Sequence, residues 1–318
     1  MSVCCARRHR VLPAVAVFLG TLGVLAAIAC RETRPVPEAA AVDPRAPLRV
    51  AVVNYPLAYL AARIGDTEVD VWFDAPADVD PAFWRPGPET IVRYQESDLI
   101  LDSGAGYAGW MATATLPVSR IVDTSAAFTD QLIEAEGTVT HTHGPEGEHE
   151  HGGFAFTTWI DPALAILQAE AIRDAMSEQR LDRADVFAAN FDLLARDLRE
   201  LDARLRAAVA QAPDRSLLFS HPVYDYLIRR YGIVGHSVHW EPDEGPGPEQ
   251  WRELEHLAEE HDARVMVWEG EPISSTVAEL HARGIESVVF DPCANRPETG
   301  DLLSVLSANA DALAAAYQ

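Results

Sequence analysis

Short apolar runs and amphipathic segments alternate along most of this chain, and this alternation constrains the fold more than any other feature. Short runs of this kind, bounded by turn residues, are typical of strands buried on both faces. Strands joined by helices in short steps indicate parallel sheets covered by helices. The predicted strands are 48–53, 69–73, 98–102 and 121–123, then 217–219, 236–240, 264–268 and 288–290. The pattern therefore predicts an α/β protein with two sheets, in which the second half repeats the architecture of the first.

A long helical segment lies between the two halves, from about Arg183 to Ala212. Its apolar residues recur at spacings of three and four, which places them in one stripe along the helix. They are Phe187, Phe191, Leu194, Leu198, Leu201 and Leu205. Such a stripe predicts a spine packed against both lobes, with a coiled-coil partner face as the alternative. The predicted organisation is an N-terminal lobe at 48–180, a linking helix at 181–212 and a C-terminal lobe at 213–318.

The first 30 residues predict an export signal rather than a part of the fold. Residues 1–10 carry three arginines and no acid, and 11–29 is an apolar run that ends in small residues before Cys30. The ending Ala-Ile-Ala-Cys resembles a bacterial lipobox, although alanine replaces its usual leucine. We therefore predict that Cys30 is lipidated and becomes the mature N-terminus. A cleaved signal without lipid and a retained membrane helix are the alternatives.

Residues 31–47 are rich in Pro, Ala, Glu and Arg, a composition that predicts a flexible tether. Loss of the signal removes three arginines and no acid, so the net charge changes from −24 to −27. A chain this acidic repels nucleic acid and attracts cations. Cys293 is then the one free thiol, which excludes an internal disulfide. These features predict an extracytoplasmic protein, in the periplasm or on the cell surface, that is held at the membrane by lipid.

A histidine-rich segment at 141–153 predicts metal binding. It contains His141, His143, His149 and His151, arranged as two His-x-His pairs. Neutral imidazole is the commonest protein ligand for borderline transition metals. The glycines and proline among the histidines indicate a mobile loop rather than a helix or a central strand. The segment lacks the fixed spacing of a structural zinc site, and a solvated loop with chance histidines is the alternative.

Side chains with metal-ligand chemistry follow each predicted strand of the second half. Ligands of open parallel sheets bind beyond the carboxyl ends of the strands. The candidates are His221, His239, Glu241, Glu269, Glu271, Asp291 and Cys293. Imidazole, carboxylate and thiolate all bind borderline metals. Each candidate also has a structural interpretation, since a histidine after a strand often caps it, an Asp before Pro can cap a turn, and a lone Cys packs as a small hydrophobe.

Several blocks, in order, resemble the zinc/manganese family of ABC-transporter solute-binding lipoproteins over about Leu48 to Gln318. The matching blocks are AVVNYPLAYLAARIG, SDLILDSGAGYAGWM, TTWIDPALA, FSHPVYDYLIRRYGI and VVFDPCANRPETGDLLSVLSANADAL. The histidine-rich segment stands where zinc-specific members carry a similar insertion. The resemblance implies two α/β lobes joined by a long rigid helix, with a metal ion held in the cleft between them.

The resemblance also implies four metal ligands, and this chain keeps two of them. His221 and Asp291 correspond to the third and fourth ligands, whereas Ala82 and Thr157 replace the histidines of the first two blocks. Alanine has no donor atom, and threonine is a poor zinc ligand. Three arrangements are therefore open. The histidine-rich segment joins His221 and Asp291 in the cleft, local residues take over, or the segment binds metal without the cleft. The local residues are His239, Glu241, Glu269 and Glu271.

We therefore predict an extracytoplasmic solute-binding component of a metal ABC importer, with Zn²⁺ as the transported ligand and Mn²⁺ as the alternative. Its partners would be an ABC permease, the ATPase of that permease and the membrane, but not nucleic acid. Neither His-Glu-x-x-His nor Gly-x-Ser-x-Gly occurs in the chain, which argues against an enzyme. A metal buffer or chaperone without a permease, and a cleft that binds a non-metal ligand, are the alternative functions.

Overall fold

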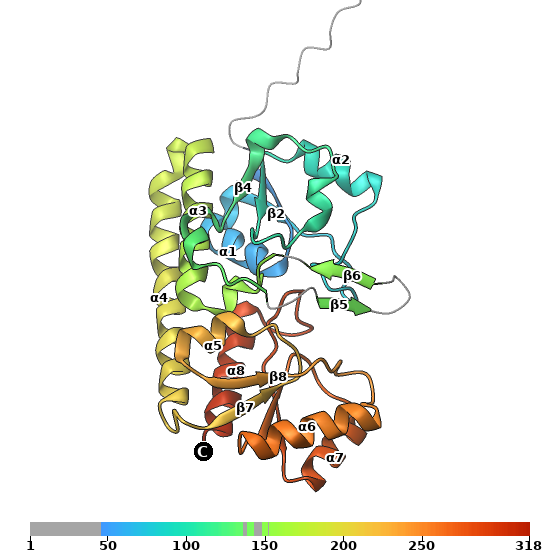
Figure 1. Ribbon diagram of the computed structural model, residues 1–318. Helices are drawn as coiled ribbons and strands as arrows, with labels where there is room; N and C mark the ends of the chain where they lie inside the picture. Colours follow the sequence, from blue (N-terminus) through green and yellow to red (C-terminus); the bar gives the residue numbers. More distant parts are fainter. Residues whose placement is uncertain (1–45, 136–138, 143–147, 152) are drawn as a thin grey trace, which may run out of the picture. The chain divides into compact units, whose positions relative to one another are not determined.

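The structure is a computed structural model that describes residues 46–135, 139–142, 148–151 and 153–318 (Figure 1). The predicted signal, Cys30 and residues 31–45 of the predicted tether lie outside the described residues. The chain from Arg45 to Gln318 forms one compact unit. Within the described ranges, no helix combines the length and the apolar composition needed to cross a membrane.

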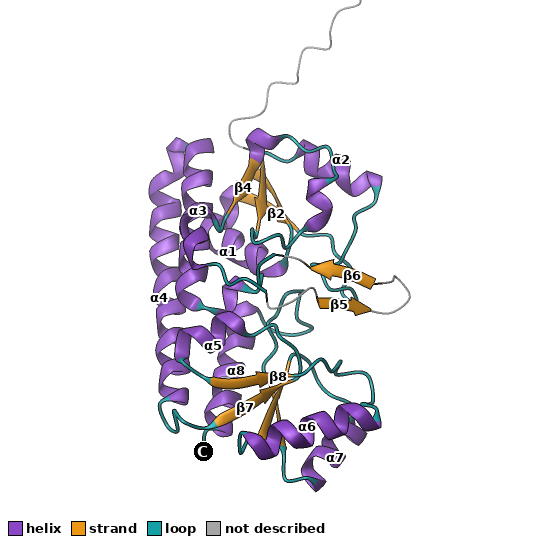
Figure 2. Cartoon of the chain, viewed as in Figure 1, coloured by secondary structure: helices purple, strands orange, loops and turns teal. Residues whose placement is uncertain are grey.

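The first half of the compact unit contains a four-stranded parallel sheet with the order β2-β1-β3-β4. Its strands are β1 (Leu48–Val52), β2 (Val69–Trp72), β3 (Leu99–Asp102) and β4 (Ile121–Asp123). Helices α1 (Tyr55–Gly65), α2 (Pro88–Glu96) and α3 (Pro162–Gln179) cover it (Figure 2). Successive residues of β1 pack into different clusters, since Val50 and Val52 join the main core whereas Ala51 packs with Tyr94 of α2. Both faces of the sheet are therefore buried, which explains the continuous apolar runs.

The second half contains a second parallel sheet with the order β10-β9-β7-β8. Its strands are β7 (Ser216–Phe219), β8 (Val234–Ser237), β9 (Val265–Trp268) and β10 (Glu286–Val289). Its helices are α5 (Asp225–Tyr231), α6 (Pro248–Glu260), α7 (Ser274–Ala282) and α8 (Leu302–Ala316). Counted within each half, both sheets have the strand order 2-1-3-4. The prediction of an α/β fold with a repeated architecture is confirmed. We call the two halves the first and second lobes.

Helix α4 (Ala184–Val209) is the predicted long helix, and its apolar stripe is buried along its whole length. It packs against α1 and α3 of the first lobe and against α5 and α8 of the second. All six residues of the stripe belong to the main core, which includes residues of both lobes. The interpretation as a spine is therefore confirmed over that of a free coiled-coil face.

Two strands of the second sheet begin and end earlier than predicted, and one of them is β10, at Glu286–Val289 rather than 288–290. Strand β8 is Val234–Ser237 rather than 236–240. The buried residues Val238 and Trp240 suggested the later position. Their backbone N–H groups donate to the carbonyls of Phe219 and Ser220, so the chain still follows the end of β7 after β8 has ended.

The prediction of an irregular loop at 141–153 is wrong for the ends of that segment. Strands β5 (Val139–Thr142) and β6 (Glu148–His151) form an antiparallel pair with His141 opposite His149 (Figure 1). Two such strands need only each other as partners, so the glycines and proline between them do not prevent pairing. His143 lies outside the described residues.

Candidate metal site

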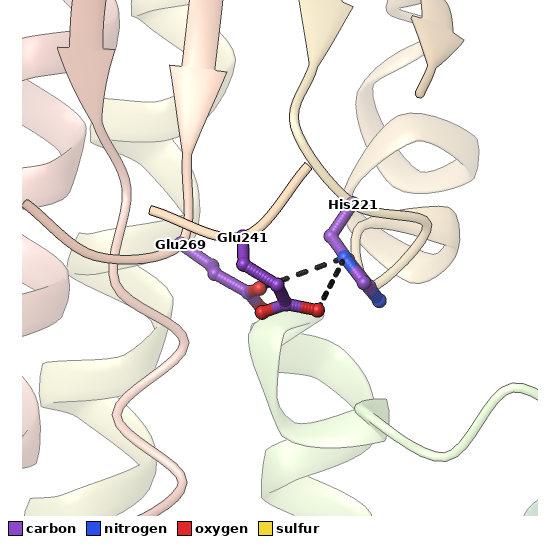
Figure 3. A group of neighbouring side chains, drawn as sticks. All are labelled: His221, Glu241 and Glu269. Carbon is purple, nitrogen blue, oxygen red and sulfur yellow. Dashed lines mark ion pairs between the residues drawn. The ribbon is translucent and has the colours of Figure 1, made fainter. Parts of the chain in front are cut away.

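Three predicted ligand residues of the second lobe converge on one point (Figure 3). The Nδ1 atom of His221 lies 3.8 Å from Oε1 of Glu241 and 3.7 Å from Oε1 of Glu269. Their ligand atoms all lie within 4.8 Å of one another. We call these three residues the metal group. Among the described residues, no other set of three or more His, Cys, Asp or Glu side chains meets this distance criterion.

The metal group is positioned by the carboxyl ends of three adjacent strands. His221 follows β7, Glu241 follows β8, and Glu269 comes directly after β9. Ser220, the residue before His221, is hydrogen-bonded to both neighbouring segments. Its N–H donates to the carbonyl of Val267, and its carbonyl accepts the N–H of Trp240. The parallel pairing thus brings together residues that are 48 positions apart in the chain.

The charges of the metal group suit a cation. Burial, as the largest cause, and the nearby carboxylates of Glu241, Asp80 and Asp291 together raise the pKa of Glu269 to about 8. Glu269 is therefore largely protonated at pH 7 when no cation is present. A divalent ion would displace this proton and relieve the repulsion between carboxylates.

Asp291, which the family resemblance assigns as a ligand, is near the metal group but not part of it. Its Oδ1 accepts the N–H of Cys293 at 2.6 Å, and its own N–H donates to Asn309. Burial raises the pKa of Asp291. Its charge contributes to the raised pKa of Glu269. Asp291 therefore acts on the site through its charge, while its carboxylate caps a turn.

Three other candidates lie outside the metal group. The ring of His239 lies 5.6 Å from the ring of His221 in an edge-to-face arrangement, and His239 is not among the residues whose ligand atoms converge within 4.8 Å. Glu271 is exposed and lines a separate hollow with His281 and Glu286. Cys293 is buried, and burial raises the pKa of its thiol to about 12, which disfavours the thiolate needed for ligation.

The two positions where the family resemblance implies a ligand histidine have structural roles in this chain. Ala82 is buried in the main core. The hydroxyl of Thr157 donates to the carbonyl of Val223 at 2.5 Å, which joins the first lobe to the second. The position that a ligand histidine would occupy therefore contributes a hydrogen bond between lobes.

Asp80 is a first-lobe residue whose charge acts on Glu269 and which sequence reasoning did not single out. Its charge is among the causes of the raised pKa of Glu269, across the boundary between the lobes. Asp80 also caps its own loop, since its Oδ1 accepts the N–H of Ala82 at 2.9 Å. The signal was present in the sequence, because Asp80 lies only two residues before the lost histidine position.

The two separations measured from His221 fit an ion of zinc size after a small contraction. Donor atoms around a tetrahedral zinc lie about 3.3 Å apart, given bond lengths of about 2.0–2.2 Å. The separations from His221 are 3.7 and 3.8 Å, so its two partners need to approach by about half an ångström. One imidazole and two carboxylates leave further coordination positions open.

Comparison with known proteins places the chain in a family. Residues 50–316 match the family model described as zinc-uptake complex component A, periplasmic. The zinc-binding lipoprotein AdcA of Streptococcus pneumoniae is 24% identical over 281 residues, which cover 84% of this chain and 55% of AdcA. A putative metal-binding protein of Chlamydia muridarum is 24% identical over 264 residues, which cover 83% of this chain and 91% of the relative. The chain spans about half the length of the AdcA relatives that it matches.

Solved structures agree on the fold. The metal-dependent lipoprotein YcdH of Bacillus subtilis has a TM-score of 0.73 at 21% identity, with 84% of this chain and 98% of that chain covered. Zn(II)-bound AdcA of S. pneumoniae has a TM-score of 0.73 at 19% identity, with coverage of 85% and 57%. The resemblance identified from the sequence blocks is confirmed, and this chain belongs to the family of zinc-uptake complex component A periplasmic proteins.

Proposed function

We propose that this protein is the solute-binding component of a metal ABC importer and that it captures Zn²⁺ as cargo at His221, Glu241 and Glu269. Of the three arrangements open from the sequence, this corresponds to local residues replacing the lost histidines. The single observation that carries the proposal is the convergence of these three side chains within 4.8 Å at the carboxyl end of the second sheet.

The chemistry of the group supports capture and release rather than catalysis. An imidazole and two carboxylates bind a divalent ion directly, and protonation of any of them weakens binding. The family description names uptake, and the relatives that carry the names AdcA and YcdH are described as zinc-binding or metal-dependent. These names support zinc as the cargo of this chain.

Manganese is the second candidate cargo. The ligand atoms of the metal group are the feature that supports it. Two of the three donors are carboxylates, which suit harder ions better than a site made mainly of imidazoles. The histidines at 141, 143, 149 and 151 favour zinc as the ion that is collected before transfer to the metal group. Competition between Zn²⁺ and Mn²⁺ for one equivalent of protein separates the two.

The partners and location belong to the same proposal. An ABC permease and its ATPase would receive the ion, and a lipid on Cys30 would hold the protein outside the cytoplasm. The apolar run before Cys30 supports the anchor, as does the description of the AdcA and YcdH relatives as lipoproteins. Mass spectrometry of the protein from membranes tests the anchor directly, since a lipidated Cys30 is heavier than an unmodified one.

Zinc titration of the protein by calorimetry at pH 7.5 and pH 5.5 tests the function. We expect one tight site at pH 7.5 and clearly weaker binding at pH 5.5, because protons then compete for His221 and Glu269. Equal affinities at the two pH values would contradict the proposal, and so would the absence of a tight site.

A further inference from the structure

The loop after Asp291 connects the two lobes by a series of hydrogen bonds. The carbonyl of Pro292 accepts the indole N–H of Trp159 at 2.7 Å, and the carbonyl of Ala294 accepts the N–H of Tyr55 at 3.0 Å. Both donors belong to the first lobe. The loop thus leaves the end of β10 and is fastened to the other lobe within three residues of Asp291.

A left-handed turn directs the loop toward the first lobe. Cys293 has φ of 58°, a conformation that costs a non-glycine residue on the order of 1 kcal/mol or more. The Asp291 carboxylate accepts the N–H of Cys293 and holds this turn in place. A turn maintained against its intrinsic preference indicates that the position of the residues after it matters.

Asn295 makes the most specific of these contacts. Its Nδ2 donates to the carbonyl of Pro76 at 2.6 Å and to the carbonyl of Val79 at 2.9 Å. Its Oδ1 accepts the N–H of Arg296 at 2.7 Å, which fixes the orientation of the amide. An asparagine amide has two N–H donors, so both are used to hold one loop of the first lobe.

Arg296 fastens the same first-lobe loop at its other end. Its Nη2 donates to the carbonyl of Phe73 at 3.2 Å, and its guanidinium lies 5.7 Å from the centre of the Phe73 ring. Together the two side chains hold residues 73–79 at three carbonyls. The next residue is Asp80, whose own side chain is fixed by the N–H of Ala82.

We propose that Asn295 is a positioning residue for metal retention. By holding residues 73–79 of the first lobe against the loop that follows β10, it keeps the two lobes fastened beside the metal group, where Thr157 of the first lobe also donates to Val223, two residues after His221. Asn295 itself does not contact the ion. This inference rests on the proposed metal-binding function.

Two variants of Asn295 and one matched control test the proposal in the full-length protein. Asn295→Ala removes both donors, and Asn295→Asp keeps the shape but places a carboxylate against two carbonyl oxygens. Asn190→Ala is the control, because the Nδ2 of Asn190 also donates to a backbone carbonyl, that of Ile64 at 2.9 Å, but on α4. The measurements are the rate of zinc release into excess chelator and hydrogen exchange of the 73–84 backbone in the metal-free protein.

We expect zinc release about tenfold faster in Asn295→Ala, because two hydrogen bonds are lost. Release should be at least as fast in Asn295→Asp, because a carboxylate then faces two carbonyl oxygens. Exchange of residues 73–84 should accelerate in both variants, and Asn190→Ala should change neither measurement. If hydrogen exchange of residues 73–84 were unchanged in Asn295→Asp, the proposal that Asn295 holds this loop would be wrong. Faster exchange with unchanged release would overturn its role in retention. A wild-type protein that binds no zinc would instead refute the proposed function, whereas the exchange experiment would still test the loop.

Discussion

The two sheets have the same strand order but different chemistry at their carboxyl ends. Asn54 and His221 each stand two residues after the first strand of their lobe. Asn54 is fully buried and accepts the N–H of Leu57, so it caps helix α1. His221 instead points toward two carboxylates (Figure 3).

The residues that directly follow β3 and β4 differ in the same way from Glu241 and Glu269 of the second lobe. After β3 and β4 of the first lobe, Ser103 and Thr124 are fully buried, and Thr124 donates to the carbonyl of Asp102 within the lobe. After β8 and β9 of the second lobe, Glu241 and Glu269 keep part of their surface exposed. At similar backbone positions, the first lobe therefore has side chains that hydrogen-bond within the lobe, whereas the second lobe has side chains with candidate ligand atoms. The proposed site therefore takes all three of its donors from the second lobe.

Replacing His221 should have the largest effect on zinc affinity. A small effect would contradict the difference between the two lobes. We expect His221→Ala to reduce zinc affinity at pH 7.5 by at least about 100-fold, because the only imidazole of the metal group is lost. Asn54→Ala is the matched control at the equivalent position. It should cost about 1 kcal/mol of stability through the lost helix cap and leave affinity unchanged. Calorimetric titration and thermal unfolding of both variants give the answer.

Replacing Glu269 should have a smaller effect on affinity and a distinct effect on pH dependence. The carboxyl of Glu269 has a pKa of about 8 in the folded protein, against an ordinary value of 4.5. Between pH 4.5 and pH 8 the folded state therefore binds a proton that the unfolded state has lost. Stability of the metal-free protein therefore falls as the pH rises from about 4.5 to about 8. Glu269→Gln should remove this loss and stabilise the metal-free protein at pH 8 by roughly 1 to 3 kcal/mol.

The same variant should bind zinc about tenfold more weakly at pH 8, since the amide is a poorer ligand than a carboxylate. Denaturant unfolding at pH 4.5 and pH 8 measures the stability change. A Glu269→Gln protein with the wild-type decrease in stability between these values would show that another group titrates.

The histidine-rich segment should have the smallest effect on the tight site. If the second lobe supplies the donors, replacement of all four histidines by alanine should change the affinity of that site by less than about threefold. The positions are His141, His143, His149 and His151. The variant should still lose additional weak zinc binding, because isolated imidazoles bind borderline ions. A loss as large as that of His221→Ala would instead favour a site completed by the segment.

The sequence predicted the fold well because its signals are local. Apolar runs at 48–52 and 265–268, and the stripe of α4, follow from burial on both faces of a sheet and on one face of a helix. The wrong limits of β8 have a physical reason, since Val238 and Trp240 are buried without belonging to the strand.

The site was predicted only in part because its geometry depends on pairing between distant segments. The family resemblance placed His221 and Asp291 ahead of His239, Glu241, Glu269 and Glu271, whereas the structure brings Glu241 and Glu269, and not Asp291, together with His221. Only the position of each side chain separates them, since Asp291 caps a turn and Glu271 is exposed. The contribution of Asp80 and Asn295 required knowledge of which loops of the two lobes meet.

X-ray absorption at the zinc edge, on protein loaded with one equivalent of zinc at pH 7.5, tests the central claim most directly. A site built from the metal group has one imidazole, together with oxygen donors at about 2.0–2.2 Å. The account predicts that count, and His221→Ala should abolish its imidazole signal. A first shell with two or more imidazoles, or with sulfur, would contradict it.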